Sequence, residues 1–208
     1  MKKPTPKPVS DWRGGFLFLG NHLALDFLNT RPVQNGEATE LLPDFGALLR
    51  WFQAAELLRP GELLKIRQRW AESSRAERSL DLALELRERL RKEVFAWEAG
   101  APVHRAMTDE LNRLMAVYPM RSRLKTTTNG VAMERWFETE QPEDLLAPLA
   151  ASSAALFVEI SRDRVRKCAE CVLHFHDTSK KGTRRWCSMQ LCGNRLKVAA
   201  YAARQRKA

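Results

Sequence analysis

The sequence predicts a mainly α protein: a multi-helical body with one β-hairpin, followed by a small C-terminal module built around cysteines. Three observations support this fold class. Apolar residues recur at helical spacing over most of the first 160 residues. The dipeptide Asn129-Gly130, a strong hairpin signal, stands between two segments with strand-forming residues. All four cysteines of the chain lie between positions 168 and 192.

Each expected helix has a start signal or an apolar stripe. Asn21 is expected to cap a short apolar helix that ends near Thr30, and Asp44 to cap a second helix. Pro60, at a first helical position, opens a third. The remaining helices are expected at about 76–99, at 108–118 with Thr108 as the cap, and at 143–165, the last running directly into the first cysteine.

The predicted hairpin consists of residues 121–128 and 131–137. Residues 1–14 carry prolines among lysines, and we expect a disordered arm there. No long linker precedes the cysteines, so their module is expected to dock on the body. The expected domains are the arm at 1–14, a helical domain at 15–160 and the cysteine module at 161–208.

Charge is distributed very unevenly along the chain. The net charge is +10, and residues 161–208 alone contain 13 Lys or Arg against 3 acids. The first 160 residues are therefore neutral overall. A neutral body with a cationic end is typical of proteins that bind a polyanion, either nucleic acid or an anionic membrane.

The first 30 residues contain no apolar run that is long enough for a signal peptide or a membrane span. We therefore expect a cytoplasmic protein that does not enter a membrane. Thiols stay reduced in that compartment, so four clustered cysteines indicate a function other than disulfide bonding.

The cysteine spacing predicts a metal site. Cys168 and Cys171 form a C-x2-C pair, and Cys187 and Cys192 form a C-x4-C pair after 15 intervening residues. Two short-spaced pairs can supply the tetrahedron of thiolates that zinc prefers. An all-cysteine shell has no open position, so we expect one structural Zn²⁺ per chain in a treble-clef-like zinc finger.

The intervening residues are expected to form the finger's short hairpin, with 172–177 as the outgoing strand and 183–186 as the returning strand, followed by a helix after Cys192. Several alternatives remain open. The cysteines could be unrelated buried thiols, or the first pair could be a redox C-x-x-C. His174 and His176 could serve as ligands, although exposed or supporting histidines are also compatible with the pattern.

Motifs at both ends of the chain resemble a known pair of families. RRWCSM at 184–189 and CGNR at 192–195 are similar to the CGNR zinc-finger family. LALDFLNT at 23–30 resembles the opening of the ABATE domain, which commonly precedes that finger, and LLRWF at 48–52 fits its next helix. The resemblance implies a stress-induced transcription regulator, and hence DNA as a partner.

Basic residues around and after the cysteines are the candidates for phosphate contacts. Arg184 and Arg185 are neighbours on an expected strand, so at most one of them faces a given phosphate, and the other could bond the body. The candidates are Arg184, Arg185, Arg195, Lys197, Arg204 and Arg206. A solvated surface, a counter-charge for the zinc thiolates, or a zinc-stabilised protein-interaction module without nucleic-acid binding are the alternatives.

Polar residues on the first helix define a second candidate site. His22, Asp26, Asn29 and Thr30 share neighbouring positions on an otherwise apolar helix. They could line a pocket for an unknown small-molecule ligand, or they could cap neighbouring helices. No nucleophile motif accompanies them, so we do not expect an enzyme. The body could also form a homodimer.

Overall fold

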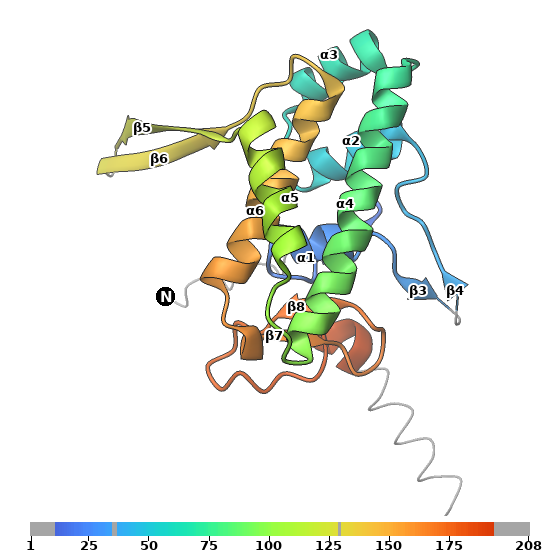
Figure 1. Ribbon diagram of the computed structural model, residues 1–208, viewed down its shortest axis with the longest axis vertical. Helices are drawn as coiled ribbons and strands as arrows, with labels where there is room; N and C mark the ends of the chain where they lie inside the picture. The colour runs from blue at the N-terminus through green and yellow to red at the C-terminus, as the bar shows by residue number, and fades with distance from the viewer. Residues whose placement is uncertain (1–10, 35–36, 129, 194–208) are drawn as a thin grey trace, which may run out of the picture.

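The computed structural model describes residues 11–34, 37–128 and 130–193 (Figure 1). Its six α-helices are α1 (Leu23–Leu28), α2 (Phe45–Ala54), α3 (Pro60–Trp70), α4 (Ser74–Glu98), α5 (Arg105–Val117) and α6 (Leu146–Glu159). Short 3-10 helices at Pro142–Leu145 and Arg162–Arg164 flank α6, and a π-helical turn covers Met189–Gly193. The predicted mainly α class is confirmed.

The strands form four two-stranded antiparallel sheets in the described part of the chain. The pairs are β1 (Trp12–Arg13) with β2 (Phe16–Leu17), β3 (Val33–Gln34) with β4 (Glu37–Ala38), β5 (Arg121–Thr127) with β6 (Gly130–Trp136), and β7 (Val165–Lys167) with β8 (His174–His176). None of the described helices combines the length and apolar composition that a membrane span requires.

The long helices α4, α5 and α6 run alongside one another, and α1 packs across α4 and α6 (Figure 1). Aromatic rings fill the centre of the body. The rings of Phe27 and Trp51 lie 5.4 Å apart, and those of Trp51 and Phe52 lie 5.5 Å apart. Burial of these large apolar surfaces is the main contribution to folding of the body.

Local start signals placed some helices correctly. The Asp44 carboxylate accepts a hydrogen bond from the backbone N–H of Ala47 at 2.6 Å, as a cap should. Pro60 is the first residue of α3. Helix α4 begins two residues earlier than expected because Ser73 caps it through the N–H of Ala76.

Two predicted caps are wrong. Helix α1 follows His22, while Asn21 has φ 53° and donates from its side chain to the carbonyl of His176. Helix α5 begins at Arg105 rather than near Thr108, whose hydroxyl donates to the Arg105 carbonyl. In both places a partner distant in sequence decides the geometry, and for α5 that partner is Glu93, which accepts from the N–H of residue 104.

The helix expected at 143–165 is also shorter than predicted. Helix α6 ends at Glu159, and Ile160 adopts an extended conformation. Residues Val165–Lys167 instead form β7, which pairs with β8 in the register Val165 to His176. An extended residue, the 3-10 turn Arg162–Arg164 and the start of β7 therefore replace the last turns of the expected helix.

The Asn-Gly hairpin is confirmed as β5–β6, which projects from the body (Figure 1). Opposed residues of an antiparallel pair share a face. The register pairs Leu124 with Met133 and Thr126 with Val131, so three apolar side chains lie on one face. Their exposed fractions are 72% for Leu124, 69% for Val131 and 58% for Met133.

A buried guanidinium joins three segments of the body. Arg87 on α4 is 2% exposed and donates to both oxygens of Glu40, at 2.8 and 2.5 Å, and to the Thr30 hydroxyl at 2.9 Å. Burial raises the pKa of Glu40, but the hydrogen bonds from Arg87 and from the backbone N–H of Leu42, together with the charges of Arg87 and Arg31, hold this pKa below its ordinary value. The charge of Arg87 is therefore compensated within the fold.

We predict that Arg87→Met lowers the free energy of unfolding by about 3 kcal/mol, because it leaves the Glu40 carboxylate and the Thr30 hydroxyl without their buried donor. Adding Glu40→Gln should recover part of this loss. Urea denaturation of the two single variants and the double variant measures the coupling. Strictly additive losses would contradict the assignment of the pair.

Candidate metal centre

The four cysteines come together as a tetrahedral donor set. The Sγ atoms of Cys168, Cys171, Cys187 and Cys192 all lie within 4.8 Å of one another. Cys171 and Cys187 are 3.4 Å apart, and Cys187 and Cys192 are 3.7 Å apart. A Zn–S distance of about 2.3 Å places tetrahedral ligands roughly 3.8 Å apart. The donor set therefore fits one zinc ion.

Backbone hydrogen bonds position the two cysteine pairs. The N–H of Cys168 donates to the carbonyl of Leu173 at 2.8 Å, which closes the turn between β7 and β8 around the first pair. The N–H of Cys192 donates to the carbonyl of Ser188 at 3.1 Å within the π-helical turn. A bond from the N–H of Ala169 to the carbonyl of residue 185 joins the two halves.

The hairpin expected between 172–177 and 183–186 is wrong. Strand β8 pairs with β7, so the first cysteine pair lies in the turn of the finger's hairpin. Residues 183–186 form no strand, because the buried Asp177 carboxylate accepts from the backbone N–H groups of Ser179 and Arg184 and holds them in a loop. The helix expected after Cys192 lies outside the described residues.

Neither histidine of this segment belongs to the cysteine cluster. His174 is fully buried, and its Nε2 lies 3.1 Å from a carboxylate oxygen of Glu98 at the end of α4. Its ring also contacts Phe95 edge-on, with centroids 4.8 Å apart. His174 therefore supports the contact between the finger and α4, so of the alternatives left open for it the structure favours a buried supporting residue over an exposed one.

The thiols compete for ionisation when no metal is bound. Hydrogen bonds from Cys171 and Cys187 lower the pKa of Cys168, while the same bonds raise the pKa of Cys171 and of Cys187. Burial raises the pKa of Cys192 to about 12. A zinc ion must therefore displace thiol protons, and its dipositive charge compensates the thiolates that form.

Hydrogen bonds and apolar contacts attach the finger to the first helix of the body and the segment before it. The Asn29 amide donates to the carbonyl of His174 at 2.8 Å and accepts from its N–H at 3.0 Å. The N–H of His176 donates to the carbonyl of Gly20 at 2.7 Å. The side chain of Leu19 packs within the cysteine core. The finger is thus docked, as the absence of a linker predicts (Figure 1).

Three of the four candidate pocket residues, Asp26, Asn29 and Thr30, form side-chain hydrogen bonds within the chain. Asn29 bonds the finger, and the hydroxyl of Thr30 donates to the carbonyl of Phe27 and accepts from Arg87. Asp26 accepts from the N–H of Gly20 at 2.7 Å. Burial lowers the pKa of His22, whose buried Nδ1 has no hydrogen-bond partner among the described residues. These contacts favour a structural function for the first three, and a ligand pocket stays a prediction.

The two arginines before Cys187 have different surroundings. The guanidinium of Arg184 donates to the carbonyl of Cys187 and lies 4.9 Å from the ring centre of Phe175. Arg185 is exposed, and its guanidinium lies 5.8 Å from the Trp186 ring. The structure therefore brings one arginine into the finger and leaves the other at the surface. The remaining candidates, Arg195, Lys197, Arg204 and Arg206, lie outside the described residues.

The sequence analysis did not identify three cationic residues that line one cavity together with Arg184 and Arg185. Arg162, Arg166 and Lys167 line this open cavity of about 480 Å³, together with the acids Glu98 and Asp163. Arg162 lies on the segment that was expected to be helical and the other two directly follow it, so their convergence with the second cysteine pair was not visible. The excess of positive residues from 161 onward was the available signal.

The buried Asp26 generates a pH prediction. Burial raises the pKa of its carboxyl from 3.8 to about 6. Between these values the unfolded chain has already lost its proton, so folding becomes less favourable as the pH rises. Asp26→Asn carries no such proton, and its stability relative to the wild type should increase by about 1 kcal/mol from pH 5 to pH 7.5. Urea denaturation at both pH values measures this change.

The matched control is Asp81→Asn, which changes an exposed carboxylate on α4. Its stability difference from the wild type should stay constant over the same pH interval. An Asp26→Asn difference that is equally constant would show that the carboxyl ionises normally in the folded protein.

For the metal site we expect about one zinc per chain, released progressively at acid pH as the ligand thiols regain protons. Cys168→Ser should lose zinc and retain most of its circular dichroism at 222 nm, because α1–α6 all end before the first cysteine. A colorimetric chelator assay measures the metal. Freshly reduced protein without zinc, or a variant without helix, would contradict this expectation.

Comparison with known proteins places these features in a family. Residues 21–159 match ABATE, described as "Putative stress-induced transcription regulator". Residues 164–205 match the CGNR zinc finger. No curated protein matches the chain. The first match covers more than half of the sequence, and the second includes all four cysteines, so this chain belongs to the ABATE family and carries a CGNR zinc finger able to bind one zinc ion.

Proposed function

We propose that this protein is a transcription regulator whose zinc finger binds DNA through phosphate contacts. The observation that carries the proposal is the cationic cavity on the finger, where five Lys or Arg side chains face two acids. Arginine and lysine side chains gathered at one surface are the usual electrostatic footprint of nucleic-acid binding. The family description, a regulator of transcription, supports the same conclusion.

The two acids of the cavity are already engaged. Glu98 bonds the ring of His174 and also accepts from the backbone N–H of Lys167 at 2.9 Å. Asp163 is bonded to the hydroxyl of Ser161. Neither carboxylate forms an ion pair with a lining cation among the described residues, so positive charge at the cavity remains available to an anion.

The arginines of the finger divide into two groups. Arg164 donates to the carbonyls of Asp177 and Ser179, and Arg184 to that of Cys187, so both stabilise loops of the finger. Arg185 makes no ion pair among the described residues, and its guanidinium lies 5.8 Å from the centre of the Trp186 ring. Structural arginines therefore supply the counter-charge near the cysteines, and Arg185 is the best placed for a phosphate.

We predict a strong salt dependence of DNA affinity. A surface that neutralises about four to six phosphates gives a slope of log K against log salt near −4 to −5. Arg185→Gln should flatten this slope by about 0.9 and weaken binding to all duplexes equally, because a phosphate contact carries no sequence information. Fluorescence anisotropy with labelled duplexes at several salt concentrations measures both quantities.

Arg69→Gln is the matched control. Arg69 is exposed and also lies over the ring of a following tryptophan, Trp70, at 4.9 Å, but it is on α3 at the opposite end of the body (Figure 1). Both variants remove one positive charge, so only Arg185→Gln should change the slope. Absence of binding to any duplex by zinc-loaded protein at low salt would refute the proposal and favour the protein-interaction alternative.

A further inference from the structure

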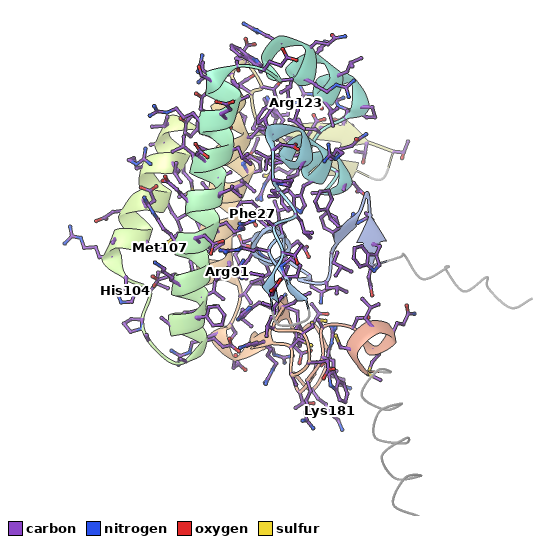
Figure 2. The ribbon with its side chains drawn as sticks, turned by 90° about the vertical axis from the view of Figure 1, so that its right-hand side faces the viewer. Phe27, Arg91, His104, Met107, Arg123 and Lys181 are labelled. Atoms are coloured by element: carbon purple, nitrogen blue, oxygen red, sulfur yellow. The ribbon has the colours of Figure 1, made fainter. Side chains whose placement is uncertain are left out.

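A second cavity lies where the body meets the finger. Its volume is about 360 Å³, which is within the range of small-molecule sites. Its walls come from the segment after α1, from the β3–β4 pair, from α4, and from β7 and the turn after it. Figure 1 shows the finger below the C-terminal end of α4, and Figure 2 labels Arg91 on that helix.

The charged residues that line this cavity are all cations. They are Arg31, Arg91 and Lys167, and no acid lines it. Arg31 and Arg91 share a single carboxylate, that of Glu88, at 3.3 Å each, and Glu88 also pairs with Arg87. The Glu88 carboxylate therefore forms ion pairs with three guanidinium groups. The Arg91 side chain is 22% exposed, and this burial lowers its pKa.

Apolar side chains form the rest of the wall. Val33, Phe95 and Val172 come from three separate segments, and their exposed fractions are 41%, 39% and 36%. The Nζ atom of Lys167 lies 5.5 Å from the ring centre of Phe95, so a cation and an apolar surface adjoin directly. Exposed apolar groups gathered around fixed charges are typical of a ligand site.

Val172 adds an independent indication. Its φ angle is 58°, in the left-handed region where a β-branched residue is strained. Glycine would suit this turn at lower cost, since it has no Cβ. The side chain that causes the strain forms part of the cavity wall. Strained residues of this kind cluster at ligand sites, where the side chain has a function that offsets the cost.

We propose that this cavity binds a small organic anion, with a carboxylate or phosphate head group on the three cations and a short apolar tail against Val33, Phe95 and Val172. Guanidinium groups suit both kinds of head group because their planar donors match two acceptor oxygens. The apolar wall requires the tail, since inorganic anions would leave it exposed. This inference goes beyond DNA binding, and its test is made without DNA.

The test uses zinc-loaded, full-length protein and four probes: hexanoate, hexyl phosphate, hexan-1-ol and inorganic phosphate. Nitrogen-15 NMR titration follows the amide signals of Lys167, Val172 and Leu173. Hexanoate or hexyl phosphate should shift them saturably with one site per chain, and the better of the two identifies the head group. Hexan-1-ol and inorganic phosphate should each bind at least about tenfold more weakly.

Variants test the site itself. Arg31→Gln should weaken the better probe about tenfold, while Arg89→Gln, which changes another exposed, ion-paired arginine outside the cavity, should have no effect. Val172→Gly should retain zinc and weaken the six-carbon probes about fivefold through loss of apolar contact. Equal binding of hexan-1-ol, equal effects of the two arginine variants, or no saturable shift with either anion would overturn the proposal.

Discussion

The paired hydrogen bonds between Asn29 and the backbone of His174 hold the two parts of the molecule in one arrangement. The side-chain amide both donates to and accepts from one residue of β8, and so substitutes for a neighbouring strand. Asn21 and the Gly20 carbonyl satisfy His176 in the same way. Because both groups of His174 are buried, losing Asn29 would leave them unpaired and would weaken the attachment of the finger to α1.

Other buried polar side chains of the body also help to hold the finger in place. Asp26 accepts the N–H of Gly20, which fixes the segment that carries the Gly20 carbonyl to the finger. The cost is a carboxyl whose pKa is raised to about 6. Glu98 provides the other attachment, through His174 and the N–H of Lys167. The finger is therefore attached to both α1 and α4, and its cysteine core packs against Leu17 and Leu19 of the body.

Structural features set by residues a few positions apart were predictable from the sequence, and contacts between distant residues were not. The cysteine spacing, the Asp44 cap, Pro60 and the Asn-Gly turn each depend on residues a few positions apart, and the structure confirms all four.

Asn29 bonds a residue 145 positions away, and this partner cannot be inferred from a helical pattern. The predicted helix ended at Val165, but the pairing of Val165–Lys167 with β8 is only possible once the chain has turned through the first cysteine pair. Because this segment pairs with β8, Arg166 and Lys167 line the same cavity as Arg185. This cationic cavity could therefore not be predicted from the sequence.

Lys167 links the two proposed sites. It lines the cationic cavity on the finger and the smaller cavity at the joint, while Glu98 holds its backbone N–H in place. An anion at the joint would draw the Lys167 ammonium toward Phe95 and away from a phosphate of DNA. By thermodynamic linkage, DNA would then weaken the affinity for the small anion by the same factor as the anion weakens DNA binding. If both proposed sites are occupied as inferred, competition for the Lys167 side chain couples the small anion to the DNA-binding surface.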